Sequence, residues 1–209
     1  MKAIVFIDVQ NDFAKGGKLA FGYPVEDNVP KIVEFAKECV ADVNCKIYAT
    51  RDTHEKTMFE DLGTMVKFDQ RGRVNDTEQI NGTPIAGYLA TLEGKNLPIE
   101  HCIEGTDGWQ IVDSLMNVLL GNATFVNKPT FGSYDLVDII SEDFGKNGPD
   151  EIIICGYDLA VCVISNALML RAKYPNVKIT IKKDLCGCIS EETFNAALCV
   201  AKCCQINIE

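Results

Sequence analysis

Short apolar, β-branched runs alternate along this chain with longer segments in which apolar residues recur at helical spacing. The expected strands are 3–9, 46–52, 123–128, 151–156, 177–183 and a short last one at 205–209. The expected helices are 29–43, 109–120, 134–144, 161–174 and 190–204. Strands that alternate with helices are typical of a parallel sheet covered on both faces. The pattern therefore predicts an α/β fold, a Rossmann-like three-layer α/β/α sandwich with a mostly parallel six-stranded sheet.

The segment at about 53–108 breaks this alternation. It is polar, contains glycine and is long, with one helix expected in "PIAGYLATLEG" at 84–94. A long excursion in a compact domain is usually functional or a subunit contact. The chain has 209 residues, enough for one large domain and too few for two of comfortable size. We therefore expect a single domain, 1–209, with a long loop insertion at about 53–108.

Charge and apolar content exclude two classes of partner. The formal net charge is −10 at pH 7 and the sequence pI is about 4.7, so the surface would repel a nucleic-acid backbone. No apolar run approaches the roughly 20 residues that cross a bilayer, so we expect no membrane span. The start, "MKAIVFIDVQNDF", reaches an aspartate too soon for a signal peptide. We therefore expect a cytoplasmic protein whose cysteines are reduced.

Ten cysteines are present, without a paired CxxC motif. "CGC" at 186–188 and "CC" at 203–204 do not have the spacing of the common structural zinc sites. We interpret most of these residues as ordinary buried thiols. Cys162 is the candidate exception, because it lies near the expected start of a helix, just after the apolar run "EIIICG".

Reactive side chains follow the expected strands at their carboxyl ends, where open α/β sheets bind ligands. Asp8 ends the first strand, and Asp52 ends the second, with His54 two residues further on. Lys128 ends the third strand, and Cys162 follows the fourth. We therefore predict that one edge of the sheet brings together a carboxylate, an amine, a thiol and a pair of possible metal ligands, Asp52 and His54.

The thiol at this edge is a candidate nucleophile. A helix N-terminus and a nearby lysine both lower a thiol pKa and favour the thiolate. Asp8 is the candidate general base, and Lys128 would hold thiolate and carboxylate in register. Position alone leaves the alternative open, in which Cys162 packs against the sheet, the carboxylate is solvated and the lysine lies on the surface.

The two histidines of the chain suggest a metal site. Asp52 and His54 are two residues apart, so an extended segment points both to one side. A carboxylate and an imidazole suit zinc, iron or manganese, and His101 in "IEHCIEGTDG" would supply a third ligand. Glu55 and Glu60 are further candidates that spacing does not separate. The alternative is two solvent-exposed histidines.

Five motifs occur in order along nearly the whole chain: "FIDVQNDF", "ATRDTHEKTMF", "PIEHCIEGTDG", "VNKPTFGSYD" and "GYDLAVCVISNA". Together they resemble the isochorismatase-like cysteine hydrolase superfamily and, within it, the nicotinamidases. The resemblance implies a catalytic triad of Asp8, Lys128 and Cys162. It also implies a divalent metal ion, with zinc before iron or manganese, and the implied metal ligands are Asp52, His54 and His101.

The resemblance further implies a reaction on a small-molecule amide, nicotinamide. The Cys162 thiolate would attack the carbonyl, and backbone N–H groups around Asp158 and Cys162 would stabilise the oxyanion by about 3–4 kcal/mol per donor. Asp8 would move the proton, and water would hydrolyse the thioester. Phe13 would pack on the ring, and the metal would hold the pyridine nitrogen. The family also implies a cis peptide at Tyr157–Asp158 and a homo-oligomer.

The chain departs from the nicotinamidase pattern at four positions. Pro98 stands where tryptophan is usual, and Leu159 and Ala160 replace threonine and aspartate beside the nucleophile. Tyr134 would take the place of a phenylalanine near the pocket, as a substrate contact. These changes leave the triad intact and leave the substrate open.

Other functions remain alternatives to a nicotinamidase. One is a hydrolase of another small amide or carbamoyl compound, and another is an isochorismatase-type hydrolase, which cleaves a vinyl ether without a thiol. A receiver-like signalling domain also has acids after its first strand and a Lys-Pro after a late strand, as in "NKP" here. A degenerate homologue that only binds its ligand is the remaining alternative.

Overall fold

The main sheet contains six strands, and a computed structural model describes residues 1–59 and 83–209 of the chain. These strands are β1 (Lys2–Ile7), β2 (Cys45–Asp52), β5 (Ala123–Lys128), β6 (Glu151–Gly156), β7 (Lys178–Cys186) and β8 (Asn207–Ile208). All neighbours pair in parallel, in the order β5-β2-β1-β6-β7-β8. This is the doubly wound order, in which the direction of strand addition reverses between β1 and β6. The predicted parallel six-stranded α/β fold is confirmed.

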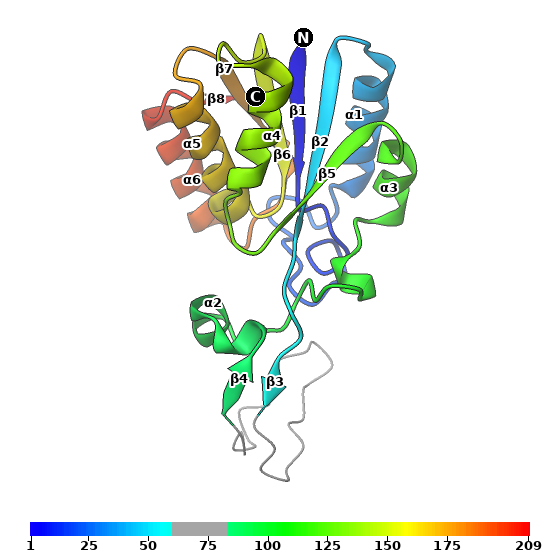
Figure 1. The fold of residues 1–209 in the computed structure, drawn as a ribbon, viewed down its shortest axis with the longest axis vertical. Coiled ribbons are helices and arrows are strands. Elements are labelled where there is room, and N and C mark those ends of the chain that lie inside the picture. Colours follow the sequence, from blue (N-terminus) through cyan, green and yellow to red (C-terminus); the bar gives the residue numbers. More distant parts are fainter. Residues whose placement is uncertain (60–82) are drawn as a thin grey trace.

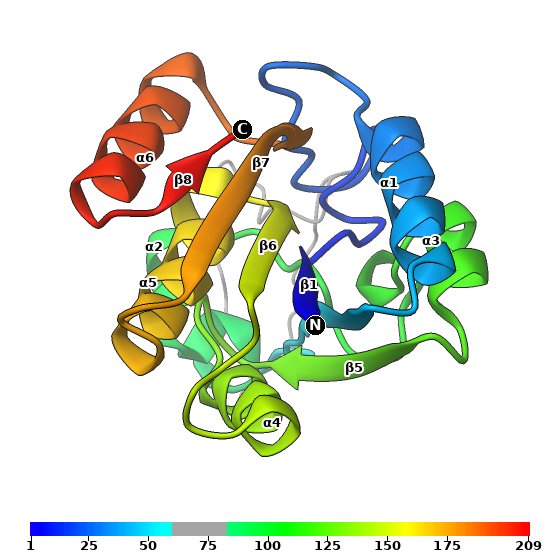
Figure 2. The ribbon, with the colours of Figure 1, turned by 90° about the horizontal axis from the view of Figure 1, so that it is seen from above.

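Helices cover both faces of this sheet (Figures 1 and 2). Two helices, α1 (Val29–Ala41) and α3 (Asp113–Leu119), lie together on one face. The other face carries α4 (Tyr134–Phe144), α5 (Ile164–Lys173) and α6 (Glu191–Cys203). None of the helices in the described ranges combines the length and apolar character needed to span a membrane.

Strand β1 lies at the centre of the core. Its residues Ala3 to Ile7 are at most 1% exposed, because β2 and β6 flank the strand and helices cover both of its faces. A strand buried on both sides consists of apolar residues throughout, which explains the uninterrupted run "AIVFI". The first polar side chain after it, Asp8, is therefore held at the carboxyl end of a rigid element.

The described parts of the segment between β2 and α3 lie beyond the carboxyl edge of the sheet (Figure 1). Their regular elements are an antiparallel pair, β3 (Met58–Phe59) with β4 (Pro84–Ala86), a short helix, α2 (Leu92–Asn96), and two 3₁₀ turns, at Tyr88–Ala90 and Asp107–Trp109. That residues 1–209 form one domain with a loop insertion at about 53–108 stays a prediction.

The single helix expected at 84–94 is wrong. Gly87 interrupts it with a φ of 80°, and a Cβ atom at this position would lie 2.3 Å from the carbonyl oxygen of Lys56. The chain therefore turns closely against its own backbone there, and only glycine fits. Thr91 then starts α2 by accepting a hydrogen bond from the N–H of Gly94.

Candidate active site

A cavity of about 490 Å³ opens at the carboxyl edge of the sheet. Its lining includes Asp52 at the end of β2 and Cys162, which follows β6, together with Phe13 and His101. The edge between β1 and β6 is the point where strand order reverses, and doubly wound sheets bind ligands in that crevice. The cavity therefore lies where the fold is expected to hold a substrate.

Cys162 lines this cavity and meets Asp8 and Lys128 behind it; Asp8, Lys128 and Cys162 are 0%, 1% and 5% exposed. The Lys128 Nζ atom lies 2.7 Å from Asp8 Oδ2 and 3.4 Å from Cys162 Sγ. Nζ also donates to the carbonyl oxygen of Thr130 at 3.0 Å and lies 3.3 Å from Asp52 Oδ1. The structure thus brings together the three residues of the expected triad, although their catalytic role stays a prediction.

The carboxylate of Asp8 is held by its neighbour Thr50 on β2. The Thr50 hydroxyl donates to Asp8 Oδ1 at 2.6 Å, and the backbone N–H of Asp8 donates to the same hydroxyl at 3.1 Å. Asp8 also has a φ of 50°, which is rare outside glycine and ends the strand sharply. These contacts leave Oδ2 directed at Lys128.

Burial shifts the pKa values of Asp8 and Cys162. It raises the pKa of the Cys162 thiol well above its usual range, against the Lys128 charge, and the nearby Asp8 carboxylate raises it further. The prediction of a lowered thiol pKa is therefore wrong for the free site. Burial also raises the pKa of Asp8, which makes this carboxylate a stronger base than one in water. The thiol of Cys162 is therefore protonated in the free site.

Cys162 itself lies in a π-helical turn, Leu159–Val163, that leads into α5. Asp158 caps this turn, because its carboxylate accepts the N–H of Ala160 at 2.6 Å and the N–H of Ile189 at 3.1 Å. π-Helical turns occur often at functional sites, where they aim one side chain out of register. The expected oxyanion donors at Asp158 and Cys162 belong to this turn, and their role stays a prediction.

The expected cis peptide at Tyr157–Asp158 is not present, and this bond is trans. The backbone on either side is already fixed by hydrogen bonds. Tyr157 donates its N–H to Ile7 at 2.9 Å, and Leu159 donates its N–H to Gly187 at 2.9 Å. A trans peptide satisfies both contacts and avoids the cost of a cis bond before a non-proline residue.

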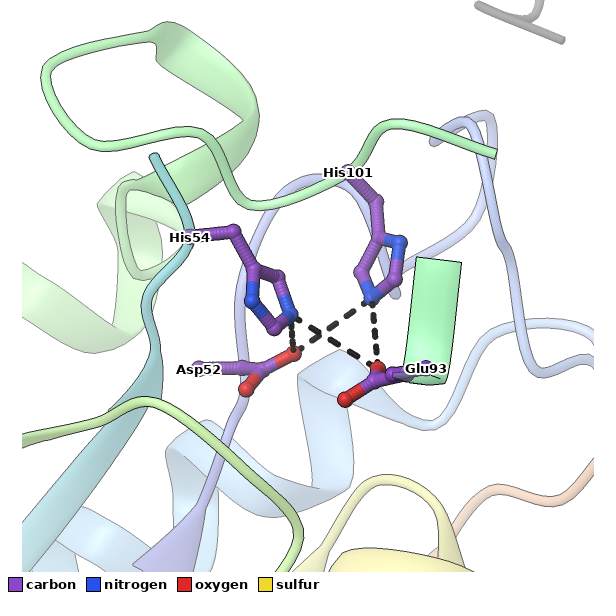
Figure 3. Close-up of side chains that lie close together, drawn as sticks. All are labelled: Asp52, His54, Glu93 and His101. Atoms are coloured by element: carbon purple, nitrogen blue, oxygen red, sulfur yellow. Dashed lines mark hydrogen bonds and ion pairs between the residues drawn. The ribbon is translucent and has the colours of Figure 1, made fainter. Parts of the chain in front are cut away.

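Four side chains beside the triad converge on one point: Asp52, His54, Glu93 and His101 (Figure 3). One ligand atom from each lies within 4.8 Å of the others. His54 Nε2 and His101 Nε2 lie 3.0 and 3.4 Å from Asp52 Oδ2, and 3.7 and 3.8 Å from Glu93 Oε1. The two histidines are 6% and 2% exposed, so the alternative of solvent-exposed histidines is wrong.

The donor set fits a divalent metal ion. His101 Nδ1 lies 2.7 Å from the carbonyl oxygen of Ile99, which must accept its proton, so Nε2 is left as a lone-pair donor facing the group. Burial would raise the pKa of Asp52, but the Lys128 charge holds it well below its usual range, so this carboxylate is ionised. Two imidazoles and two carboxylates are ligands that zinc, iron and manganese accept.

Comparison with known proteins agrees with this arrangement. The family model described as the isochorismatase domain matches residues 2–206. The chain belongs to the isochorismatase family. It is therefore a hydrolase of that family, and the receiver-like alternative is wrong. No curated protein sequence matches the chain.

Solved structures similar to this isochorismatase family member include three amidases. The nicotinamidase of Bacillus subtilis is 19% identical with a TM-score of 0.71, and the match covers 99% of this chain and 98% of that one. The Pyrococcus horikoshii pyrazinamidase in complex with zinc is 22% identical with a TM-score of 0.67, covering 100% and 98%. The yeast nicotinamidase bound to the inhibitor nicotinaldehyde is 18% identical with a TM-score of 0.65, covering 100% and 99%. At these identities the likeness shows a shared fold.

Sequence reasoning did not find Glu93 as a metal-facing residue of this family member. The chain brings it from α2, which lies nearly forty positions after the Asp52–His54 pair. Glu55, one of the expected candidates, is exposed, and Glu60 lies outside the described residues. The available signal was weak, since α2 is too short to show a helical period and many acidic residues occur nearby.

We call Asp52, His54, Glu93 and His101 the metal group. Sequence reasoning also missed two polar residues after β1 that hold the backbone of this group in place. Gln10 holds the backbone of Asp52 from both sides, because its Oε1 accepts the N–H of Asp52 at 2.7 Å and its Nε2 donates to the carbonyl oxygen at 2.9 Å. Asp12 accepts the backbone N–H of Cys102, next to His101, at 2.8 Å. Both are buried and position metal-facing residues through the backbone.

Of the two residues expected to contact substrate, the structure places one at the cavity and the other away from it. Phe13 is 3% exposed, lines the cavity and lies 5.4 Å from the His101 ring between centroids. Tyr134 is 82% exposed and is not part of the lining, so the expectation that it contacts substrate is wrong. It is the first residue of α4 and points to solvent, while Phe131 in the preceding loop lines the cavity.

We predict one divalent metal ion per chain, measured by elemental analysis of protein purified without chelator. His101→Ala and Glu93→Gln should each weaken metal affinity at least about tenfold, because each change removes a donor from the same point. The matched control is Glu55→Gln, an exposed carboxylate that should bind metal as the wild type does. Equal metal content in all three variants, with circular dichroism showing folded protein, would contradict the site.

Proposed function

We propose that this hydrolase is a metal-dependent cysteine amidohydrolase that converts nicotinamide and water to nicotinate and ammonia. One observation carries the proposal. The Cys162 thiol and three members of the metal group, Asp52, Glu93 and His101, line the same cavity, which Phe13 walls on one side. A thiol alone suffices for amide hydrolysis, so an adjoining metal group makes sense if the substrate carries a second ligand atom near its carbonyl.

The triad geometry supports a two-step acyl transfer. In the first step the sulfur of Cys162 bonds to the amide carbon while Asp8 Oδ2 takes the thiol proton. The C–N bond then breaks, and Asp8 gives this proton to the departing ammonia, which leaves a thioester. In the second step water attacks the thioester with Asp8 as base, nicotinate leaves, and the sulfur regains a proton. Burial raises the pKa of Asp8, which suits a carboxyl group that both accepts and donates a proton.

Lys128 keeps its charge throughout this cycle. Burial alone would lower its pKa, but Asp8, the Cys162 sulfur and Asp52 raise it well above the usual range. Its ammonium therefore stabilises the thiolate that forms during attack and orients the Asp8 carboxylate. The backbone N–H groups around Asp158 and Cys162 would bind the oxyanion.

Asp52, His54, Glu93 and His101 would hold the metal ion, with zinc first and iron or manganese as alternatives. When bound, the metal supplies a Lewis-acid position for the pyridine nitrogen and nearby water. The zinc complex of the Pyrococcus horikoshii pyrazinamidase, a structurally similar protein, supports this choice. The residues of this chain fix the ligand positions, with Gln10 bracing Asp52 and Ile99 accepting the proton of His101 Nδ1.

An isochorismatase-type reaction is less well supported. Its substrate is a dicarboxylate, and the described residues that line the cavity include no lysine or arginine to pair with those charges. A hydrolase of another small amide or carbamoyl compound is the second candidate, and Pro98, Leu159 and Ala160 favour it because they depart from the nicotinamidase pattern. A cytoplasmic location, a homo-oligomeric state and the absence of nucleic-acid or membrane partners stay predictions.

The test of the proposed function is ammonia release from nicotinamide, pyrazinamide and benzamide, compared as kcat/KM. We expect the first two to react and benzamide to react at least about 100-fold more slowly, because it lacks the ring nitrogen that the metal group would bind. Equal rates for benzamide and nicotinamide would show that this nitrogen is not recognised. Reaction of an aliphatic amide alone would favour the second candidate.

A further inference from the structure

Exposed apolar side chains gather at the mouth of the catalytic cavity. Leu92, Phe131 and Ile189 are 80%, 42% and 62% exposed, and all three line it. They come from three separate places in the fold: α2, the loop before α4 and the loop before α6. Large apolar residues that cluster at the surface usually mark a place where an apolar partner binds.

This mouth is continuous with the site of chemistry. The same cavity reaches from these exposed residues down to the buried Cys162, Asp52 and His101. Its volume of about 490 Å³ falls in the range of roughly 300–1,000 Å³ that is typical of pockets for drug-sized ligands. A single-ring amide bound against Phe13 would leave the outer part of that volume empty.

Within the part of the chain that the structure describes, the charged groups of the cavity lie at its inner end. Of the ionisable side chains in the described lining, Asp52, Glu93 and His101 belong to the metal group. Asp158 caps the turn that carries Cys162. Among the described lining residues, the outer part therefore has no charge to pair with a charged substituent.

We propose that the preferred substrate is an aromatic amide that carries an uncharged apolar substituent, which Leu92, Phe131 and Ile189 bind at the mouth. This inference rests on the proposed function, since it assumes that the carboxamide faces Cys162 and the ring nitrogen faces the metal group. On a pyridine ring, one further carbon is meta to both of these groups. Because both anchors lie at the buried end, a substituent on that carbon points toward the mouth.

The test compares nicotinamide with an analogue that carries a propyl group on that carbon, using the metal-loaded wild type. Each methylene that leaves water contributes about a fourfold gain, so kcat/KM should rise about tenfold to fiftyfold. An isomer with the propyl group on the carbon between the nitrogen and the carboxamide is the chemical control. Its substituent would point at the inner wall, and its kcat/KM should fall below that of nicotinamide.

Phe131→Ser and Ile189→Ser should each reduce the ratio of the two kcat/KM values, propyl analogue over nicotinamide, by at least about threefold. The matched control is Val43→Ser, a change at an exposed apolar residue before β2, at the opposite edge of the sheet, which should keep the ratio. Calorimetric titration of Cys162→Ala should show the same preference in Kd, which separates binding from chemistry.

A wild type that hydrolyses nicotinamide but does not prefer the propyl analogue would overturn the inference and leave the proposed function standing. A preference that survives both serine variants would overturn the assignment to these residues. If the wild type hydrolyses neither compound, the proposed function and the inference are both wrong.

Discussion

Cys162→Ala is expected to lose hydrolysis by about 10⁴-fold or more in kcat, because alanine has no atom that can form the thioester. Ammonia release from the best substrate of the amide panel measures the effect. Lys128 and Asp8 would remain in place, so substrate should still bind and KM should change little. Mass spectrometry of the wild type under rapid quenching should show an acyl adduct that the variant lacks.

The matched controls are the buried thiols Cys155 and Cys186, which lie in β6 and β7. Alanine at either position removes one buried sulfur and should cost about 1–2 kcal/mol of unfolding free energy, with turnover retained. If Cys162→Ala hydrolyses substrate at the wild-type rate, the thioester mechanism is wrong. If Cys155→Ala or Cys186→Ala abolishes activity while the protein stays folded, the assignment of Cys162 as the nucleophile is wrong.

Lys128→Met is expected to lower the free energy of unfolding by about 3–5 kcal/mol and to reduce kcat/KM by more than about 10³-fold. Methionine keeps most of the volume but removes the charge that Asp8 and Asp52 share at 2.7 and 3.3 Å. Two buried carboxylates without a counter-charge cost several kcal/mol. For a chain of this size, the loss corresponds to a fall in Tm of roughly 10 °C, measured at equal metal loading.

Lys178→Met provides the matched control for this change. Lys178 also pairs with a carboxylate at 2.7 Å, that of Glu151, but its side chain is half exposed. Exposed pairs contribute about 0–1 kcal/mol, so this variant should unfold close to the wild type. The Lys128→Met penalty should also shrink toward acid pH, where the buried carboxyls take up protons. Equal stability losses in the two variants would contradict the buried charge network.

The sheet was predictable because its strands are buried on both faces. Strands such as β1 and β6 contain long apolar runs. Asp8 directly follows β1, and Asp52 and Lys128 are the last residues of β2 and β5, so their positions at one edge followed from the parallel arrangement. Which of them touch, and at what distance, depended on side-chain geometry that no periodicity encodes.

The path of the segment at about 53–108 was predicted poorly because tertiary contacts determine it. Gly87 packs against the Lys56 backbone and breaks the expected helix at 84–94. That break sets the start of α2 and hence the position of Glu93 beside the histidines. In the same way α3 begins at Asp113 rather than 109, since Ile111 pairs with Gln10 instead of entering a helix.

The thiol pKa was predicted with the wrong sign for a related reason. A helix start and a lysine were visible in the sequence, but the depth of Cys162 below the surface was not. Desolvation outweighs both effects, so the pKa of the Cys162 thiol lies above its usual range and the thiol is protonated. The burial of this side chain depends on how all the helices and strands pack around it. A position near the end of a strand in the sequence does not reveal that burial.

The six residues that follow β1, "DVQNDF", contact both halves of the site, which are the expected triad and the metal group. Asp8 pairs with Lys128, which also contacts the Cys162 sulfur. Gln10 and Asp12 hold the backbone at and beside the candidate metal ligands Asp52 and His101, and Phe13 lines the cavity. A backbone shift of about 1 Å in this segment would misplace the base and loosen the metal group together, at a cost of about 100-fold in rate. The two halves therefore cannot change independently through this segment. Divergence toward a new substrate is freer at the cavity mouth, where the side chains of Leu92, Phe131 and Ile189 are exposed.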